Sequence, residues 1–221
     1  MKNKGMYLLL IAVVVFSSTL LATVFWYWGG GVAQRHEQID EEWVAAQDRY
    51  LQANDLLNEI VSRIGYGGFI HDFKNYVLRG DEQYVTHMYG ELASSKQAIS
   101  ALRAGGYPED SVYLDTVLET LLRYESHIGD VAQMRARGEA IGDVDRAVRV
   151  DDTAAVGALK ALQSNNRNRL MQQRLVIAQA ISTLQADIQR GLLLLAPMVL
   201  LNIAFVLALV IMGRQAKRLH D

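Results

Sequence analysis

The sequence predicts an all-α protein in which two transmembrane helices flank an extracytoplasmic up-down four-helix bundle. Two observations carry this prediction. Residues 6–28 and 191–212 are strongly apolar and contain no Asp, Glu, Lys, Arg or His. The residues between them repeat apolar side chains at seven-residue spacing, which is typical of helices and not of strands. A soluble enzyme is excluded, because each apolar stretch is long enough to cross about 30 Å of hydrocarbon.

The first element is a short N-terminus, residues 1–5, followed by the first span at 6–28. Lys2 and Lys4 precede this span, and an aromatic cluster at 25–28 marks its outer boundary. A cleaved signal peptide is the alternative reading of the same stretch. It fits less well, because the apolar run exceeds the usual length of about 7 to 15 residues and no small-x-small cleavage pattern precedes the aromatic cluster.

The second span, residues 191–212, is followed by Arg214, Lys217 and Arg218 in a short tail at 213–221. Basic residues at both outer ends predict that both termini are cytoplasmic. Residues 29–190 then face outward, which is the periplasm if the protein lies in a bacterial inner membrane. This region keeps 17 of the 22 basic residues and 23 of the 24 acidic ones, a net charge near −6. It contains no cysteine, so packing alone must hold the domain together.

Four amphipathic helices are predicted within residues 29–190. The first runs from about Ile39 to Ile64, the second covers Val85 to Leu102, and the third follows Pro108. The fourth begins near Asp151, Asp152 and Thr153, an N-cap cluster, and continues into the second span. Gly29, Gly30 and Gly31 predict a break in the first helix, because glycine costs up to about 1 kcal/mol per residue in a helix interior. The apolar stripes of the four helices are Trp43, Ala46, Tyr50, Ala53, Leu57, Ile60 and Ile64; Val85, Met88, Leu92, Ser95, Ile99 and Leu102; Leu114, Val117, Leu121, Tyr124, Ile128 and Val131; and Leu159, Leu162, Leu170, Ile177, Ile181, Leu184 and Ile188.

Signatures of catalysis are missing from the sequence. It has no HExxH, Walker or GxSxG motif and no cysteine nucleophile, and its five histidines include no pair at helical metal-binding spacing. We therefore expect a protein that is not an enzyme, with no cofactor, no metal site and no nucleic-acid partner.

The segment from 65 to 80, GYGGFIHDFKNYVLRG, is the most unusual part of the chain. Its glycines predict the end or a bend of the first helix at the far tip of the bundle. The candidate ligand-binding residues lie here, and they could hold a small anion through charge-assisted hydrogen bonds. The alternative is a purely structural network with acids such as Asp72, Glu119 or Asp130. The candidates are Tyr66, His71, Lys74, Asn75 and Arg79.

This segment, together with the run VDRAVRVDDTAA from Val144, resembles the periplasmic helical sensor regions of bacterial methyl-accepting chemotaxis proteins and of membrane-bound diguanylate cyclases and histidine kinases. The resemblance implies a dimeric bundle in which a ligand or protein partner displaces the last helix. Leu118, Leu122, Leu175 and Ala178 lie off the main stripes and favour a homodimer.

The chain departs from that pattern after Met212, where nine residues leave no room for a signalling domain. We expect either a fragment of a longer receptor or a stand-alone sensor that needs a receptor or membrane-complex partner. The predicted function is an inner-membrane sensory module. The alternative is a non-catalytic structural accessory subunit of a larger membrane complex.

Overall fold

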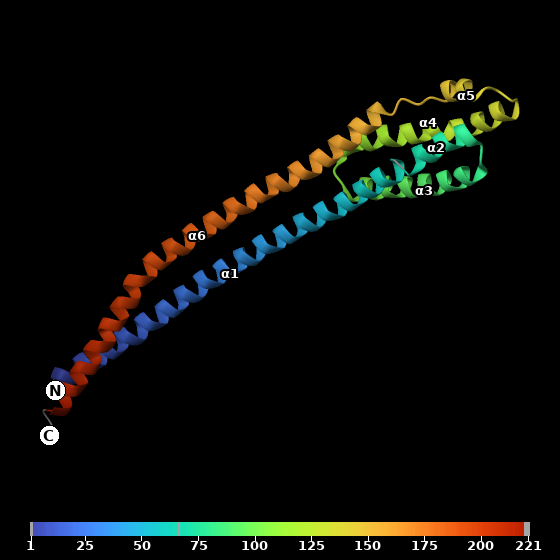
Figure 1. Cartoon of the computed structure of the whole chain (residues 1–221). Helices are drawn as coiled ribbons and strands as arrows, with labels where there is room; N and C mark the ends of the chain where they lie inside the picture. The colour runs from blue at the N-terminus through green and yellow to red at the C-terminus, as the bar shows by residue number, and fades with distance from the viewer. Residues whose placement is uncertain (1, 66, 219–221) are drawn as a thin grey trace. The chain divides into compact units, whose positions relative to one another are not determined.

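The computed structural model describes residues 2–65 and 67–218, and throughout this part of the chain the regular structure is helical, with no strand. The prediction of an all-α protein is therefore confirmed. The helices are α1 (Lys2–Ile64), α2 (Phe69–Arg79), α3 (Glu82–Gly105), the short 3₁₀ helix η1 (Pro108–Asp110), α4 (Ser111–Ala136), α5 (Ile141–Ala147) and α6 (Thr153–Arg218), as Figure 1 shows.

The contacts divide the chain into two compact units. The first contains Met1–Val44 and Arg174–Asp221, and the second contains Ala45–Gln173. Helices α1 and α6 each contribute to both units, whereas α2 to α5 belong to the second alone.

In the first unit, α1 and α6 each contain a stretch that is long and apolar enough to cross a membrane. The most apolar windows have mean hydropathies of 2.6 and 2.7, and almost none of their residues are buried. Side chains such as Leu9, Phe16 and Leu193 are more than 65% exposed. Because these side chains are exposed and not buried in a core, both stretches could span a membrane by their length and composition.

Three contacts join α1 to α6 in the first unit, and together they set the register of an antiparallel pair. Asn202 donates to the hydroxyls of Ser17 and Ser18 at 3.0 Å each, at the midpoints of the two apolar stretches. At one end of these stretches, Trp28 lies so close to Gly191 that a β-carbon there would fall 2.2 Å from the indole ring. Beyond that end, Arg35 forms a 2.6 Å ion pair with Asp187. The apolar stretches are therefore level with one another.

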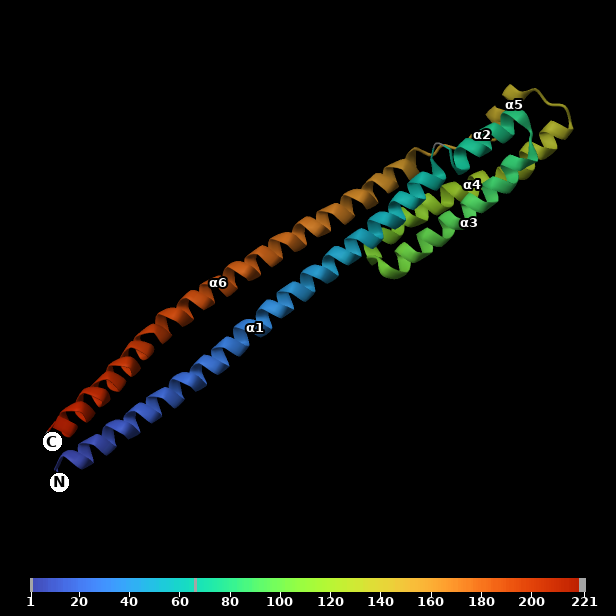
Figure 2. The same ribbon diagram turned by 60° about the horizontal axis from the view of Figure 1, so that its bottom comes forward.

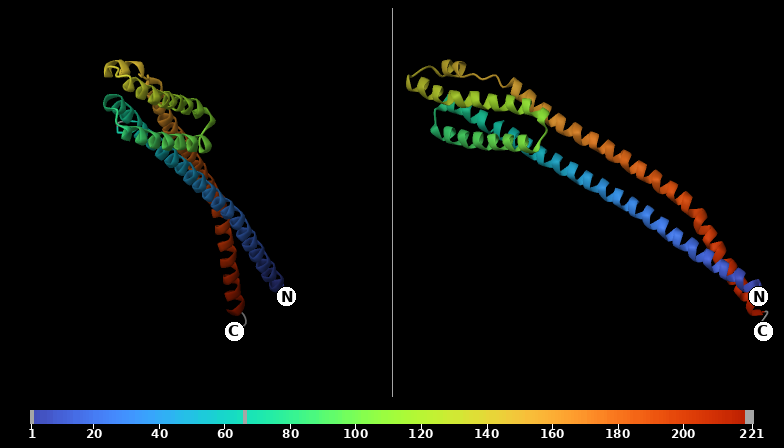
Figure 3. Two further views of the ribbon diagram at one scale, coloured as in Figure 1. Left: turned by 90° about the vertical axis from the view of Figure 1, so that its right-hand side faces the viewer. Right: turned by 180° about the vertical axis from the view of Figure 1, so that it is seen from behind.

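The predicted break at Gly29, Gly30 and Gly31 is wrong, because α1 continues through all three. Propensity is a weak determinant of structure, and a break would leave backbone groups on both sides without helical partners. Helix α6 likewise continues through Pro197. It curves within this unit (Figure 3), as expected of a helix that loses one internal hydrogen bond at a proline.

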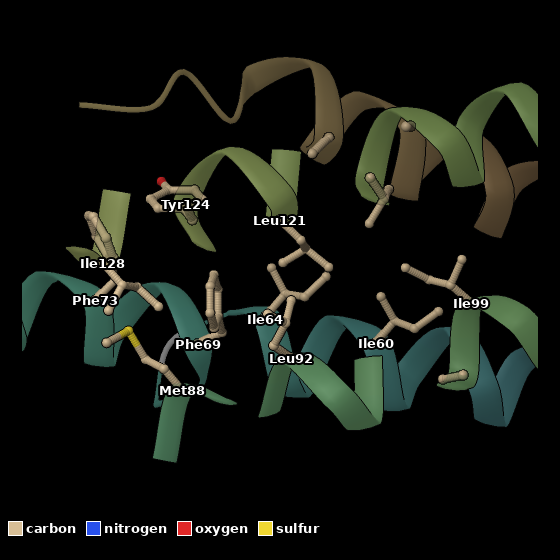
Figure 4. Close-up of a cluster of buried hydrophobic side chains, with 14 of the residues drawn as sticks. Ile60, Ile64, Phe69, Phe73, Met88, Leu92, Ile99, Leu121, Tyr124 and Ile128 are labelled. Carbon is tan, nitrogen blue, oxygen red and sulfur yellow. The ribbon is translucent and has the colours of Figure 1, made fainter. Parts of the chain in front are cut away.

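The second unit has one hydrophobic core to which α1 to α6 all contribute. In the stripes predicted from the sequence, the positions at Leu57, Met88 and Leu121 are at most 2% exposed. Figure 4 shows side chains of α1 and α2 meeting those of α3 and α4, and the rings of Phe69 and Phe73 each form a T-shaped pair with the Tyr124 ring. In α6, Leu162 is buried in this unit as predicted; in the first unit, Leu184 is buried as predicted, whereas Ile181 is 43% exposed.

Two helices of the second unit lie outside the four predicted amphipathic helices. Helix α2 is separate from α1 and packs against α3, α4 and α5, and α5 packs against α2 and α4. The predicted position of the tip was wrong. Figure 2 shows α2 running on beyond the end of α1, so that the chain turns back between α2 and α3, at Gly80 and Asp81.

Candidate functional site

The turn between α1 and α2 places the candidate segment against the rest of the second unit. Gly67 has φ of +89°, a conformation that side chains with a β-carbon rarely adopt. A β-carbon on Gly68 would lie 2.0 Å from the carbonyl oxygen of Arg63. The glycines therefore let α2 begin directly beside the last turn of α1, and they explain why this segment stands out in the sequence.

A groove of about 520 Å³ opens beside this turn, between the end of α1, the first half of α2 and the start of α6. Its size is within the range of small-molecule sites, about 300 to 1,000 Å³. Apolar atoms form most of the lining surface, and Val61 and Val156 are 39% and 45% exposed. The lining residues are Val61, Ile64, Gly65, Ile70, His71, Lys74, Asp152, Val156, Leu159, Lys160 and Gln163.

The polar groups of the groove carry more positive than negative charge. Lys74 and Lys160 are exposed, and within the described residues neither has a carboxylate within ion-pair distance. The remaining lysine of the second unit, Lys96, is paired with Glu125 at 2.9 Å. Asp152 is the one carboxylate among the described lining residues. The groove thus presents two lysine cations above apolar walls.

Asp152 also has an interaction outside the groove. Burial raises the pKa of Tyr124 to about 12, and the charge of Asp152 and a hydrogen bond with it add to this effect. The start of α6 is fixed on the other side by Asp151, whose carboxylate accepts from the Thr153 amide at 3.0 Å. This capping bond was predicted from the sequence and is confirmed.

The structure brings together only part of the predicted set of site residues. His71 and Lys74 line the groove, whereas Asn75 and Arg79 do not. Arg79 instead donates to the Tyr84 hydroxyl at 2.8 Å, near the turn into α3. Tyr66 lies outside the described residues. The sequence analysis missed Asp152, Val156, Lys160 and Gln163, which α6 contributes from the other side.

The acids that were considered as structural partners of the candidate residues have other ion pairs. Asp72 pairs with His87, Glu119 with Arg123 and Asp130 with His127. None of these pairs involves Lys74 or Arg79. These three acids therefore do not neutralise the charges of Lys74 and Arg79.

A network of charges on the opposite side of α2 ties three helices together. The buried carboxylate of Asp72 on α2 is hydrogen-bonded to Nδ1 of His87 on α3. Glu91 lies 3.5 Å from the other nitrogen of His87 and accepts from Arg63 of α1 at 3.3 Å. The hydrogen bond to Asp72 raises the pKa of His87, and the charges of Asp72 and Glu91 act in the same direction.

A second polar cluster, at Arg169, was not predicted from the sequence. Its guanidinium binds both carboxylate oxygens of Asp110, at 2.5 and 2.9 Å, and reaches Glu109 at 3.0 Å. It also stacks on Tyr107, 3.8 Å from the ring centre. Because these partners satisfy the guanidinium, the cluster serves to hold the α3–α4 connection against α6.

Among the described residues, no group of three His, Asp or Glu side chains is placed to hold a metal ion. Comparison of the chain with models of known protein families, with curated proteins and with solved structures finds no match. The groove beside α2 is the candidate site, on the basis of its size, exposed apolar walls and lysines.

Proposed function

We propose that the chain is an inner-membrane sensory module of chemoreceptor type. Its periplasmic domain binds a ligand or protein partner, and the resulting displacement of a helix passes across the membrane. The observation that carries this proposal is the continuity of α6. The helix that supplies Val156 and Lys160 to the groove is uninterrupted to Arg218 and includes the apolar residues 191–212. Helix α1 likewise contains both the residues 6–28 and Val61 of the groove wall.

The paired apolar stretches of the first unit support insertion into a bilayer. In hydrocarbon, polar side chains are favourable only when they find partners on neighbouring helices. Asn202 has such partners in Ser17 and Ser18, at the level where water would be most distant. The basic residues at both outer ends of the sequence favour cytoplasmic termini and a periplasmic domain.

The orientation can be tested with a reporter that is active only in the cytoplasm. A reporter fused at Asp221 should be active, and the same reporter inserted between Gly105 and Gly106 should be inactive. Both fusions must be recovered from the membrane fraction in similar amounts. Activity from the reporter at Gly105 would overturn the proposed topology.

The sensory role is tested by the proteins that purify with the tagged full chain from native membranes. We expect chemotaxis receptors, sensor kinases or membrane-bound cyclases, recovered in a fixed ratio to the chain. A fixed ratio to a respiratory, photosynthetic or secretion complex would instead support the alternative of a structural accessory subunit. A Val156→Asp variant, which places a charge in the groove, should lose a partner that docks there. It should retain a partner that associates through the membrane segments.

A further inference from the structure

We infer that the groove between α1, α2 and α6 binds an amphipathic organic carboxylate, with its charged group at Lys74 and Lys160 and its apolar body against Val61 and Val156. This inference rests on the proposed sensory function and names the chemical class of its ligand.

The lysines determine the charge of the ligand. The second unit has three lysines, and the two without an ion-pair partner among the described residues both line this groove. They come from different helices, α2 and α6, so a single anion between them would join the two helices. Asp152 opposes an anionic ligand less than its charge suggests, because its carboxylate is engaged with Tyr124.

The walls determine the rest of the ligand. Ile64 is buried at the base of the groove, and Val61, Ile70, Val156 and Leu159 continue the apolar surface outward. An inorganic anion such as phosphate would leave this surface in water. An aliphatic chain would cover it, and each added methylene that is buried increases affinity about fourfold, from roughly 0.8 kcal/mol. The combination of cations and apolar walls therefore selects a carboxylate with an apolar chain over a small polar anion.

The two lysines of the groove lie on different helices, so binding would affect how those helices are placed. Lys74 is on α2, which begins after the glycine turn, and Lys160 is on the helix that continues through residues 191–212. A carboxylate held by both lysines would draw the start of α6 toward α2. The groove thus couples occupancy directly to the helix proposed to carry the signal.

The test uses the full chain in lipid nanodiscs and sodium hexanoate as the probe. Hydrogen exchange measured by mass spectrometry reports on residues 61–74 and 153–163 separately from any hexanoate dissolved in the lipid. We expect protection of both segments that saturates with hexanoate concentration. Acetate and phosphate, which lack the chain, and hexanamide, which lacks the charge, should protect them at least tenfold less effectively.

Three variants locate the two halves of the ligand. Lys74→Gln and Lys160→Gln should each raise the concentration of hexanoate needed for half-maximal protection by about threefold to tenfold, the range expected for a partly exposed ion pair. Val156→Gln should weaken hexanoate binding, because it replaces part of the exposed apolar wall of the groove. Lys96→Gln, which removes the lysine paired with Glu125, is the matched control and should leave hexanoate binding unchanged.

Equal protection by hexanamide, unchanged binding in both lysine variants, or no protection by hexanoate in either segment would overturn the assignment. The reporter and purification experiments above use no ligand. They can therefore succeed when hexanoate fails, which would reject the ligand class and leave the sensory module in place.

Discussion

At the scale of single residues, the glycines of the α1–α2 turn are needed for different structural reasons. The sequence alone does not show which reason applies to which glycine. Gly67 needs its positive φ, and Gly68 needs the absence of a β-carbon beside the Arg63 carbonyl. Gly90, within α3, has no atom within 4 Å of the position of a β-carbon. The three residues look alike in the sequence and differ in what a substitution would meet.

Gly68→Ala is therefore expected to destabilise the second unit by about 1 to 3 kcal/mol, the cost of a locally strained backbone. Gly90→Ala should stabilise it by about 0.5 to 1 kcal/mol, because alanine is the better helix former. Thermal unfolding of the full chain in detergent, followed by circular dichroism, measures both. Equal effects of the two substitutions would contradict the close approach at Gly68.

His87 gives the second unit a dependence on pH. Its pKa is raised above the ordinary value of 6.5, chiefly by the hydrogen bond to Asp72, so the folded state favours the protonated ring. The stabilisation is complete below pH 6.5 and is lost as the pH rises through the raised pKa of the folded state. Because the ring is largely exposed, solvent weakens this contribution.

We expect His87→Gln to lower the melting temperature at pH 6 and to have a progressively smaller effect as the pH rises above 6.5. His127→Gln is the control, since His127 pairs only with Asp130 on its own helix among the described ion pairs. Melting curves of both variants and wild type across this range decide the matter. A difference between His87→Gln and wild type that grows with pH would show that the sign is wrong.

At the scale of elements, Arg169 is the side chain that joins α6 to the connection between α3 and α4. Its contacts to Asp110 form a two-pronged pair in which both side chains are less than 20% exposed. Removing the guanidinium leaves a largely buried carboxylate without its cation, which is more costly than losing an exposed ion pair.

Arg169→Ala should destabilise the second unit by about 1.5 to 3 kcal/mol, the range for hydrogen bonds to charged groups. Arg169→Lys should recover only part of this loss, because a lysine keeps the charge but not the planar fork. Arg167→Ala, an exposed arginine on the same helix, should change stability by less than about 0.5 kcal/mol. Chemical denaturation of the four chains measures this, and an Arg167→Ala effect as large as that of Arg169→Ala would refute the role of the cluster.

The core could be predicted from the sequence because its apolar side chains repeat at seven-residue spacing. Burying an apolar face is the main driving force for these helices, so Leu57, Met88, Leu121 and Leu162 are buried where their spacing places them. Helix α5 was missed because it has seven residues, too few for a period to show. The break predicted at Gly29 failed for a different reason: local propensity was weaker than the continuity of a long helix.

The candidate site was only half predictable. The glycines and the cluster of polar residues marked α2, and His71 and Lys74 do line the groove. The opposite wall comes from α6, about 80 residues later in the chain, and sequence spacing within one helix cannot reveal which helix lies across from it. One signal was present: Val156, Leu159, Lys160 and Gln163 follow the spacing of a single helix face that mixes apolar and cationic side chains.

At the scale of the whole molecule, the predicted homodimer would bury side chains that are exposed in a single chain. On α6, Leu175 is 71% exposed, and Ala178, Ser182 and Gln185 follow it at heptad spacing, all exposed and uncharged. Ile177 and Leu184 on the same helix are 7% exposed and face their own chain. The two sets separate an exposed face, on which the predicted homodimer would pair, from an internal one.

Single cysteines at 175, 178, 182 and 185 should form disulfide-linked dimers in intact membranes, and cysteines at 177 and 184 should not. The chain has no cysteine of its own, so the background is clean. Expression levels of all six variants serve as the control. Crosslinking that is equally strong at every position would reflect random collision, and its complete absence would exclude a dimer through this helix.

The hydrogen bonds of Asn202 bear on how the protein is made. Ser17 lies near the start of the chain and already donates to the Val14 carbonyl of its own helix at 3.1 Å. Ser17 therefore has a partner for its hydroxyl before the second apolar helix is made, whereas Ser18 bonds to Asn202 of that later helix. Asn202, 185 residues after Ser17, has its side-chain hydrogen bonds among the described residues with Ser17 and Ser18 of that earlier helix. In the proposed membrane topology, synthesis from the N-terminus would place the hydroxyls of Ser17 and Ser18 in the bilayer before Asn202 is made, so the second helix would find its hydrogen-bond partners already in position.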